Sequence, residues 1–312
     1  MAQAKGALGY LAFVPEVTWN STPGSPAMIQ LKAGVYGESM GMEIDEHISN
    51  SINAIRAVET VRGGNKHFKG SVPIEFAALG LATVLKHALG PVSTSGAGPY
   101  VHTIKRGALA AGMTLEKGFT DIAQYFVFTG AKPEKLAGSV SPSGMFTGSL
   151  DFIAGGMTAS GTPLDATLTT SVHTPFMEHE AVVTEGGGAV TVLAFDFEIT
   201  NKLDEVLAVG QRGPAAVTEG MGECTGNVTM MFENLTAFNK FLNETASELK
   251  IIFTNGANIL EFYFPEVRYI GDAVPKIATS QGVVVPLKFR AIYDTSELTD
   301  VKITFTNTET TI

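Results

Sequence analysis

The sequence predicts a mainly β protein made of two tandem units, each with one flanking α-helix. Of the 312 residues, only 17% are charged and 34 are glycine. This composition suits strands and turns better than a helical bundle. A strand followed by a helix also occurs twice, in residues 70–89 and in residues 226–243, which indicates an internal duplication.

The two predicted strands carry the same alternation of apolar residues, as expected for a strand with one buried face. These residues are Val72, Ile74 and Phe76 in the first copy and Val228, Met230 and Phe232 in the second. The two sets lie 156 positions apart (228 − 72). Leu79 and Leu85 in the first helix match Leu235 and Phe241 at the same separation, so the register persists from strand to helix.

Each predicted helix has one apolar stripe that can face a core. Leu81, Leu85 and Leu89 form the stripe of the first helix, which Gly90 and Pro91 end. The second helix repeats the stripe with Leu235, Phe238 and Leu242.

Residues 1–40 are rich in Gly, Pro, Ser and Thr and are predicted to be a loosely structured N-terminal arm or extended loop. Such an arm becomes ordered most easily against another subunit. Residues 6–14 are apolar, but no small-x-small cleavage site follows them. They are therefore interpreted as an assembly arm or a first strand, not as a secretory signal.

Residues 41–174 form the first predicted unit. A flexible loop is expected at residues 90–98, where glycine and serine are frequent. The strands of the unit are expected at residues 43–55, 70–76, 113–117, 124–132, 145–153 and 166–172.

Residues 175–188 end in three glycines and are predicted to be a linker, which leaves residues 189–312 as the second unit. Asn255 and Gly256 predict a tight hairpin. The strands of this unit are expected at residues 192–200, 226–232, 248–254, 258–268, 283–291 and 301–305.

The later strands of the two units align with a smaller offset. Phe262 and Phe264 match Phe126 and Phe128 at 136 positions (262 − 126), and residues 301–305 are aligned with residues 164–168. About twenty fewer residues therefore connect helix and hairpin in the second unit, as expected of a loop difference. The alternative explanation is that two mixed α+β segments resemble each other through shared strand preferences.

No catalytic or cofactor-binding residue is predicted, and the chain is not expected to be an enzyme. Residues 37–41 match the G-x-S-x-G form of a serine-hydrolase elbow, but no buried strand precedes the serine and no helix follows it. They are interpreted as a loop. Residues 62–66 (RGGNK) lack the spacing and the hydroxyl of a phosphate-binding loop and are interpreted as a flexible turn.

No metal site is predicted either. His173 and His179, beside Glu178 and Glu180, fit no standard zinc spacing and are interpreted as solvated linker residues. The single cysteine, Cys224, excludes an internal disulfide framework and fits folding in a reducing cytoplasm.

The net charge of −10 argues against tight binding to a nucleic-acid backbone, which requires clustered Lys and Arg. The apolar runs are shorter than the roughly 18 residues of a membrane span, so no span is expected.

Four stretches together resemble the tail tube proteins of long-tailed bacteriophages. They are residues 16–23 (EVTWNSTP), 70–90, 113–118 (MTLEKG) and 126–132 (FVFTGAK). The resemblance covers most of the first half, and the second half shares it through the internal repeat. It implies a β-sandwich with a flanking helix in each unit, closed into rings that stack into a hollow tail.

Most members of that family carry one unit per chain and form hexamers, so two units per chain imply a ring of three chains with pseudo-sixfold symmetry. The resemblance further implies a virion component assembled in the host cytoplasm, with tip, tape-measure and terminator proteins as partners. DNA would pass through the lumen without specific binding, so we expect lumen-facing positions to be acidic or neutral on average. The hairpins around residues 116–124 and 253–262 are candidates for the lumen.

Two alternatives remain open from the sequence. One is the inner tube of a contractile tail or of a related secretion apparatus. The other is a β-sandwich binding module or lectin, which would bind sugar or protein through loops such as residues 90–98.

Overall fold

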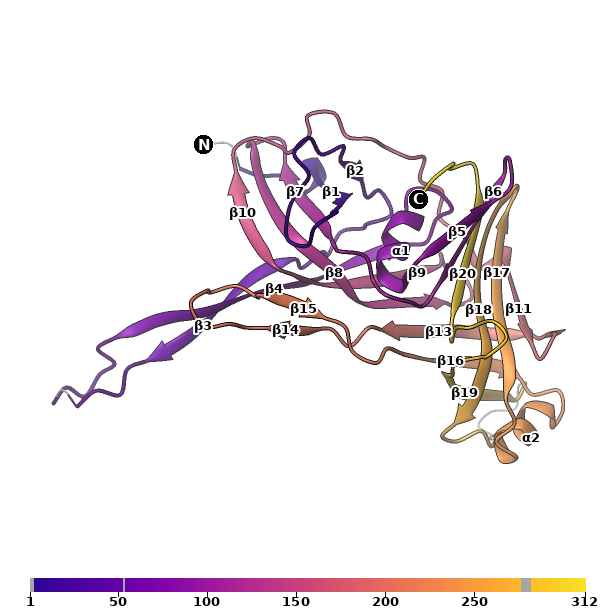
Figure 1. Cartoon of the computed structure of the whole chain (residues 1–312). Coiled ribbons are helices and arrows are strands. Elements are labelled where there is room, and N and C mark those ends of the chain that lie inside the picture. The colour runs from indigo at the N-terminus through magenta and orange to yellow at the C-terminus, as the bar shows by residue number, and fades with distance from the viewer. Residues whose placement is uncertain (1–2, 53, 276–281) are drawn as a thin grey trace.

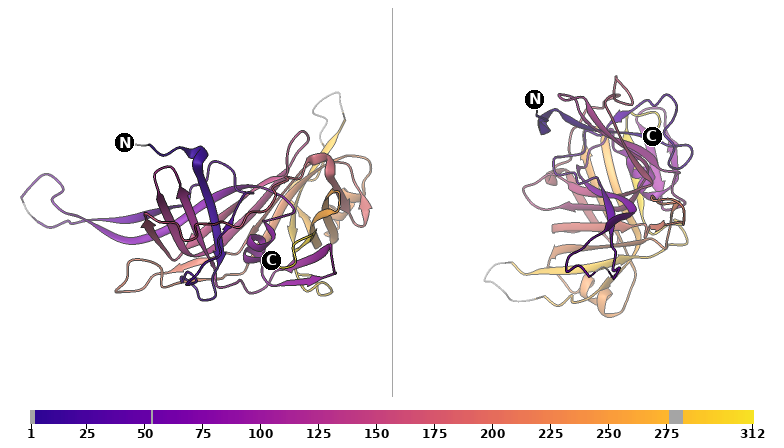
Figure 2. Two further views of the ribbon diagram at one scale, coloured as in Figure 1. Left: turned by 90° about the horizontal axis from the view of Figure 1, so that it is seen from above. Right: turned by 90° about the vertical axis from the view of Figure 1, so that its left-hand side faces the viewer.

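The computed structural model describes residues 3–52, 54–275 and 282–312 and is mainly β, as predicted. Figure 1 shows a body of twisted sheets from which one long two-stranded ribbon reaches away, on the side opposite to the helix α2. The views in Figure 2 show that this ribbon extends well beyond the body.

The first half of the chain forms two antiparallel sheets that share the long strand β8. One sheet has the order β1-β7-β8-β10, and the other has the order β3-β4-β9-β8. The strands are β1 (Gly9–Pro15), β3 (Gly41–Ile48), β4 (Val61–Glu75), β7 (Met113–Phe119), β8 (Gln124–Val140), β9 (Thr147–Ala154) and β10 (Gly156–Ser160), with a short β2 (Ile29–Gln30) beside β1 and a 3-10 turn η1 (Gly6–Leu8) before it.

The second half repeats this arrangement around the strand β18. Its sheets have the orders β11-β17-β18-β20 and β13-β16-β19-β18. The strands are β11 (Ala181–Glu185), β13 (Val192–Thr200), β16 (Glu223–Met231), β17 (Ser247–Asn255), β18 (Asn258–Ile270), β19 (Val284–Ala291) and β20 (Lys302–Asn307), with a short β12 (Gly188–Ala189) and a small ribbon of β14 (Asp204–Val206) and β15 (Ala216–Thr218).

The strand registers of the two halves also agree. Val72 lies opposite Leu150 in the β4–β9 pair, and the residues at the matching positions, Val228 and Leu287, lie opposite each other in β16–β19. The irregularity in β7–β8 between Met113 and Leu115 recurs in β17–β18 between Ser247 and Leu249. Because a slip of one residue would turn every side chain to the other face, this agreement means that matching residues face the same way in both halves.

The two helices form where the sequence predicts them, at α1 (Ala82–Leu89) and α2 (Thr236–Leu242). Gly90 ends α1 with φ +146°, a conformation that favours glycine. Their surroundings differ, because the apolar stripe of α1 is completely buried whereas Leu235 and Leu242 beside or within α2 are 56% and 62% exposed.

Residues 90–98, which the sequence predicts to be a flexible loop, contain a strand. They contain β5 (Val92–Ser95), which pairs with β6 (Tyr100–Lys105), and β6 in turn pairs with β20 of the second half. The edge of β20 supplies hydrogen-bond partners that local sequence cannot reveal, and the alternation of buried His102 and Ile104 fits this place.

Residues 1–40 are predicted from the sequence to be a loosely structured arm, but their described part contains a strand that is paired within the first half. β1 pairs with β7 along its whole length, and Phe13 is completely buried. The side chain of Glu16 is also buried, where it accepts hydrogen bonds from the hydroxyl of Thr114 over 2.7 Å and from the amide of Gly130 over 2.8 Å. This segment is therefore folded onto the first half of its own chain.

The segment 175–188, expected to be a linker, begins with buried Phe176 and continues into the 3-10 turn η2 (Glu178–Glu180) and β11. Gly186 and Gly187, both with positive φ, make the turn from β11 into β12. β11 lies beside β17 as β1 lies beside β7, so the second half takes up its strand order inside this segment.

Three other strand predictions need correction. The first strand of the ribbon ends at Ile48 and not at residue 55, and residues 62–66 belong to β4 instead of a turn. Residues 166–172 form no strand; β10 holds the place beside β8 that β20 holds beside β18. The predicted hairpin at Asn255 is confirmed, with Gly256 at φ +61° in its two-residue loop.

One continuous core joins the two halves. The large cluster of buried side chains runs from Phe13 in β1 to Phe305 in β20 and includes residues of every major sheet. The two sets of strands are thus packed as a single folded body.

Candidate functional site

Two strand pairs join the halves and make what we call the internal joint. The C-terminal part of β8 runs antiparallel to β13, from Lys135 opposite Thr200 to Val140 opposite Phe195. On the other sheet, β6 runs antiparallel to β20, from Lys105 opposite Lys302 to Tyr100 opposite Asn307. The sheets of both layers therefore continue across the joint without a gap.

Aromatic side chains fill the space between these sheets. From the first half, the ring of Phe146 stacks on Phe253 with centroids 4.4 Å apart, and Phe76 meets the edge of Phe262 at 5.6 Å. All four side chains are completely buried. Such contacts add about 0.5–1.5 kcal/mol per pair beyond the burial of area, so the joint is held as firmly as the core of either half.

Polar side chains fix the joint at its ends. The buried amide of Asn201 donates hydrogen bonds to the carbonyl oxygens of Ala88 (2.8 Å) and Pro133 (2.9 Å) in the first half. In the opposite direction, the Nε of Arg106 donates to Asp300 over 2.7 Å. The fixed fork of the guanidinium suits this bridging role.

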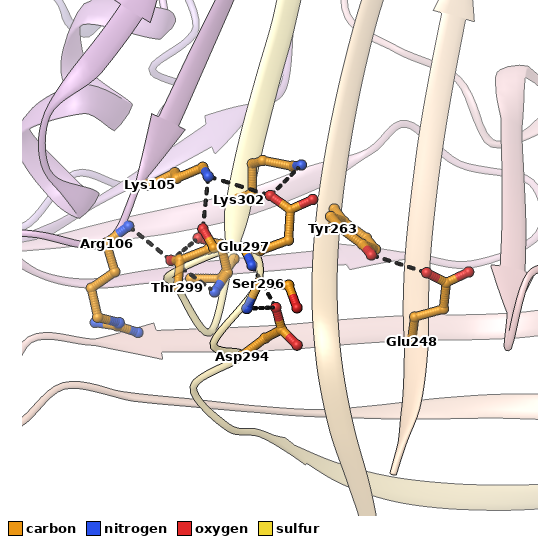
Figure 3. Close-up of polar contacts among 10 residues, drawn as sticks. Lys105, Arg106, Glu248, Tyr263, Asp294, Ser296, Glu297, Thr299 and Lys302 are labelled. Carbon is orange, nitrogen blue, oxygen red and sulfur yellow. Dashed lines mark hydrogen bonds and ion pairs between the residues drawn. The ribbon is translucent and has the colours of Figure 1, made fainter.

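Figure 3 shows the polar seam along β6 and the loop before β20. The Nζ of Lys302 donates to the carboxylate of Glu297 over 2.9 Å, and the Nζ of Lys105 does so over 3.3 Å. Hydrogen bonding from Lys302, followed by that from Lys105, lowers the pKa of Glu297. In the same view Tyr263 donates to Glu248, and burial together with this bond raises the pKa of Tyr263 to about 12.

The free ends of the chain carry the counterparts of the β8–β13 part of the internal joint. Residues 38–43 run along β4 as β13 runs along β16. The amide of Ser39 donates to the carbonyl of Ser71 over 2.9 Å, and the residues at the matching positions, Asp196 and Asn227, lie opposite each other. β13 has β8 on its second side, whereas β3 is paired with β4 alone among the described strands. At the other end, residues 271–275 follow β18 at the positions that match the C-terminal part of β8, but in the single chain they bend at Gly271, whose φ is +86°, and form no strand.

A groove lies beside the open edge of residues 38–43. It has a volume of about 620 Å³ and is lined by apolar side chains such as Leu11, Val72 and Phe119. Its polar residues include Lys117, whose Nζ donates to Glu38 over 2.8 Å. Gln30, Lys32 and Glu75 also line it, so the groove is a mixed surface in which apolar side chains lie beside charged and polar ones.

A second surface is the polar face of the β4-β9-β8-β13-β16-β19 sheet, on the side away from the core. Here cations and anions are paired: Lys135 with Asp151 at 2.9 Å, and Arg290 with Glu223 at 3.4 Å. The hydrogen bond to Asp151 is the main cause of the raised pKa of Lys135. Ser139, Ser149, Thr225 and Asn227 lie on the same face, together with the charged residues Asp196, Glu198 and Lys288. Cations and anions are thus mixed on this face.

The long ribbon of β3 and β4 exposes a row of aliphatic side chains, which is unusual for strands outside a core. Ile52 at its tip is fully exposed. The other members of the row are Ile44, Ile48, Ile55, Val58 and Val61, each between 42% and 60% exposed.

The residues considered for chemistry do not come together. Residues 37–40 form a loop, as predicted, and the hydroxyl of Ser39 accepts a hydrogen bond from the amide of Ser71. His173 is not simply solvated, because its Nε2 lies 2.9 Å from Glu75. Cys224 is buried, and burial raises the pKa of its thiol. Among the described residues no group of three or more His, Cys, Asp or Glu could hold a metal ion.

Sequence reasoning missed the joint residues because each looks ordinary on its own. The spacing of Arg106, Asn201 and Asp300 along the chain carries no signal for their meeting. The exposed aliphatic row of the ribbon leaves one signal in the sequence, the recurrence of Ile and Val among the polar residues of 44–61.

The helices in the described part of the chain are all too short or too polar to cross a membrane. Comparison with protein families matches residues 6–291 to the family described as phage tail tube protein. No curated protein matches the chain.

Proposed function

Because the chain belongs to the phage tail tube protein family and is thus a structural component of the virion tail, we propose that three copies close into a ring around a channel for DNA. Rings then stack into the tube, after assembly in the host cytoplasm. Its axial partners are further copies and the tip, tape-measure and terminator proteins of the tail. As a structural subunit it has no enzymatic role.

The observation that carries this proposal is that the β8–β13 part of the internal joint can be repeated between chains. The β6–β20 pair cannot, because the described residues between α2 and β17 form no strands, whereas β5 and β6 lie between α1 and β7. The two halves have matching registers, and the proposed cause is duplication of one tube unit. Its two copies comprise residues 41–174 and 189–312, each together with the strand that precedes it, β1 or β11. One half binds the next through β8 and β13. A head-to-tail contact of this kind generates a ring when the rotation closes, and three chains supply six units.

Ring closure assigns specific residues to the new strand pair. In the internal joint Leu136 lies opposite Ile199 and Gly138 opposite Phe197. The matching positions at the free ends place Gly271 opposite Met42 and Ala273 opposite Met40 of the next chain. Ala273 is 1% exposed, as expected for a residue that takes the buried place of Gly138.

The polar face is the proposed channel wall, in place of the hairpins around residues 116–124 and 253–262 that the sequence suggests for the lumen. Lys135 and Arg290 are held by the carboxylates of Asp151 and Glu223, so these two cations are less available to bind phosphate. Tight binding of DNA requires many contacts between Lys or Arg side chains and the phosphates. A wall with paired charges lets DNA slide, in keeping with the net charge of −10.

The long ribbon is the proposed contact between rings. Each chain has one long ribbon in its first half and one short ribbon, β14–β15, in its second. A ring of three chains therefore carries three long ribbons in alternation with three short ones. The exposed aliphatic row is then buried against the next ring.

Electron microscopy of the purified protein tests the proposal, with rings of three chains or tubes expected. Amides along a strand point alternately to its two sides. The amide of Ser39 points toward β4, and so does that of Gly41; the amide of Met42 therefore points to the open edge. Met42→Pro removes that donor and is expected to leave folded single chains, whereas Met42→Ala keeps it and forms rings. Discrete particles without a channel for the wild type would overturn the proposal.

A further inference from the structure

We propose that the groove beside β7 is a socket for a second copy of this chain, and that Phe232, Val283 and the exposed side of α2 form the plug that enters it. The inference rests on the proposed ring. It adds the side-chain contact between chains, which is separate from the strand pairing that closes the sheet.

The first support is that the same groove is closed in the second half. Leu11, Val72, Lys117 and Phe119 line the open groove. Leu11, Lys117 and Phe119 are partly exposed there, whereas the residues at the matching positions of β11 and β17 are buried: Val183, Ile251 and Phe253. Val72 and its match Val228 are both buried. What closes that groove is the first half of the chain, through Phe146 stacked on Phe253 at 4.4 Å.

The second support is that the closing side chains have counterparts at the other free end. Phe76 and Phe146 are adjacent, since the amide of Phe76 donates to the carbonyl of Phe146 over 2.9 Å. The matching residues in the second half are Phe232 and Val283, whose amide and carbonyl make the same hydrogen bond over 3.0 Å. The plug therefore has the same backbone frame as the side chains that fill the internal joint.

The third support is exposure. Phe76 and Phe146 are fully buried, whereas Phe232 and Val283 are partly exposed. The same contrast separates Phe253 and Phe262 from their first-half counterparts Phe119 and Phe126, whose rings contact each other at 6.2 Å.

The helices repeat this contrast. α1 is buried within the internal joint, where the Nζ of Lys86 donates to the carbonyl of Ile312 and the amide of Gly80 donates to Glu309. α2 has no buried residue. Exposed Leu235 and Leu242 thus lie where a neighbouring chain would cover them, as residues 309–312 cover α1.

The occupant is a second copy because the shapes are already matched inside the chain. Applying the internal joint between chains brings Val283 onto Phe119 and Phe232 onto Phe126. The socket and the internal joint differ in chemistry at one place. Lys117 stands at the position that matches Ile251, and Glu38 at the position that matches Phe195, so the socket holds an ion pair where the internal joint has two buried apolar side chains. The contact between chains is therefore the more polar and more easily separated of the two.

A charge-swap experiment tests the contact. Phe119→Lys alone and Val283→Glu alone are each expected to lower ring formation at least about tenfold at a fixed protein concentration. The two together in one chain are expected to restore rings, because each socket then faces a plug of opposite charge. Val182→Glu, at a side chain 53% exposed outside both surfaces, is the matched control and leaves rings unchanged.

The outcomes separate this inference from the proposed function. If the wild type forms no ring, the proposed function fails. If it forms rings and the single variants do so equally well, or if the double variant is not restored, the plug and socket are overturned while the ring stands. Melting of the single chains checks that each variant folds.

Hydrogen exchange on the unmodified protein gives a second test that needs no variant. Amides of residues 117–119 and 232–242 are expected to exchange more slowly in rings than in single chains. Unchanged exchange at both segments would contradict the contact.

Discussion

The side-chain amide of Asn201, at the end of β13, donates a hydrogen bond over 2.8 Å to the carbonyl oxygen of Ala88 in the last turn of α1. The two residues belong to different halves of the chain. A helix end buried without a partner for its carbonyls is costly, and here a residue more than a hundred positions away supplies that partner. The helix of the first half is thus completed by a strand of the second.

Replacing Asn201 tests how much this bond contributes. Asn201→Ala leaves the carbonyls of Ala88 and Pro133 without their donor, and a buried unsatisfied group costs about 1–3 kcal/mol. We expect a loss of this size in the free energy of unfolding, measured with urea. Asn50→Ala at an exposed ribbon position is the control, and equal stability of the two variants would contradict the expectation.

Gly130 is a position where a side chain cannot be accommodated. Its φ is +65°, and an added Cβ would lie 2.8 Å from the indole Nε1 of Trp19, which donates to the carbonyl of Gly130 over 3.1 Å. Backbone strain alone costs about 1–3 kcal/mol. Gly130→Ala is expected to lower the melting temperature by several degrees, while Gly24→Ala, with open space around it, leaves it unchanged.

His67 makes the contact between the two ribbons sensitive to pH. Its Nδ1 lies 2.6 Å from Glu205 of β14, and Asp45 and Lys69 complete the charged group. The hydrogen bond to Glu205 raises the pKa of His67 above its usual 6.5. The stabilisation is therefore complete below pH 6.5 and is lost as the pH rises through the raised pKa.

The measurement for His67 is unfolding by urea across pH 6 to 9. His67→Gln is expected to flatten the pH dependence in this range, since it removes the titrating group and keeps a hydrogen-bonding side chain. An identical slope in the variant and the wild type would rule out this assignment.

Variants at the exposed tip of the long ribbon can distinguish the formation of a ring from the stacking of rings. Ile52→Ser together with Val58→Ser removes apolar area from the proposed contact between rings without touching the core. Single rings without tubes are expected in electron microscopy. Val172→Ser, at a side chain 71% exposed elsewhere, is the control, and normal tubes from the ribbon variant would refute the role of the tip.

Three of the four stretches that carry the family resemblance meet in the structure. Glu16 and Trp19 bond to Gly130, and Glu16 also accepts from Thr114, so three of the stretches share one buried network. Their order along the sequence was enough to indicate the family. Their contact explains why the N-terminal segment is folded in place, which the Gly-rich and Pro-rich composition of residues 20–26 concealed.

The sequence by itself determined the fold class, both helices, most strands and their order in each half, because apolar alternation and turn residues act over a few neighbouring positions. Only the tertiary structure decided how the halves meet: β8 beside β13, β6 beside β20, and β11 within the supposed linker. Strand pairing depends on which backbone edges lie side by side, and any strand of suitable length offers the same donors and acceptors. That choice belongs to the packing of the whole chain, and it is the choice on which the proposed ring depends.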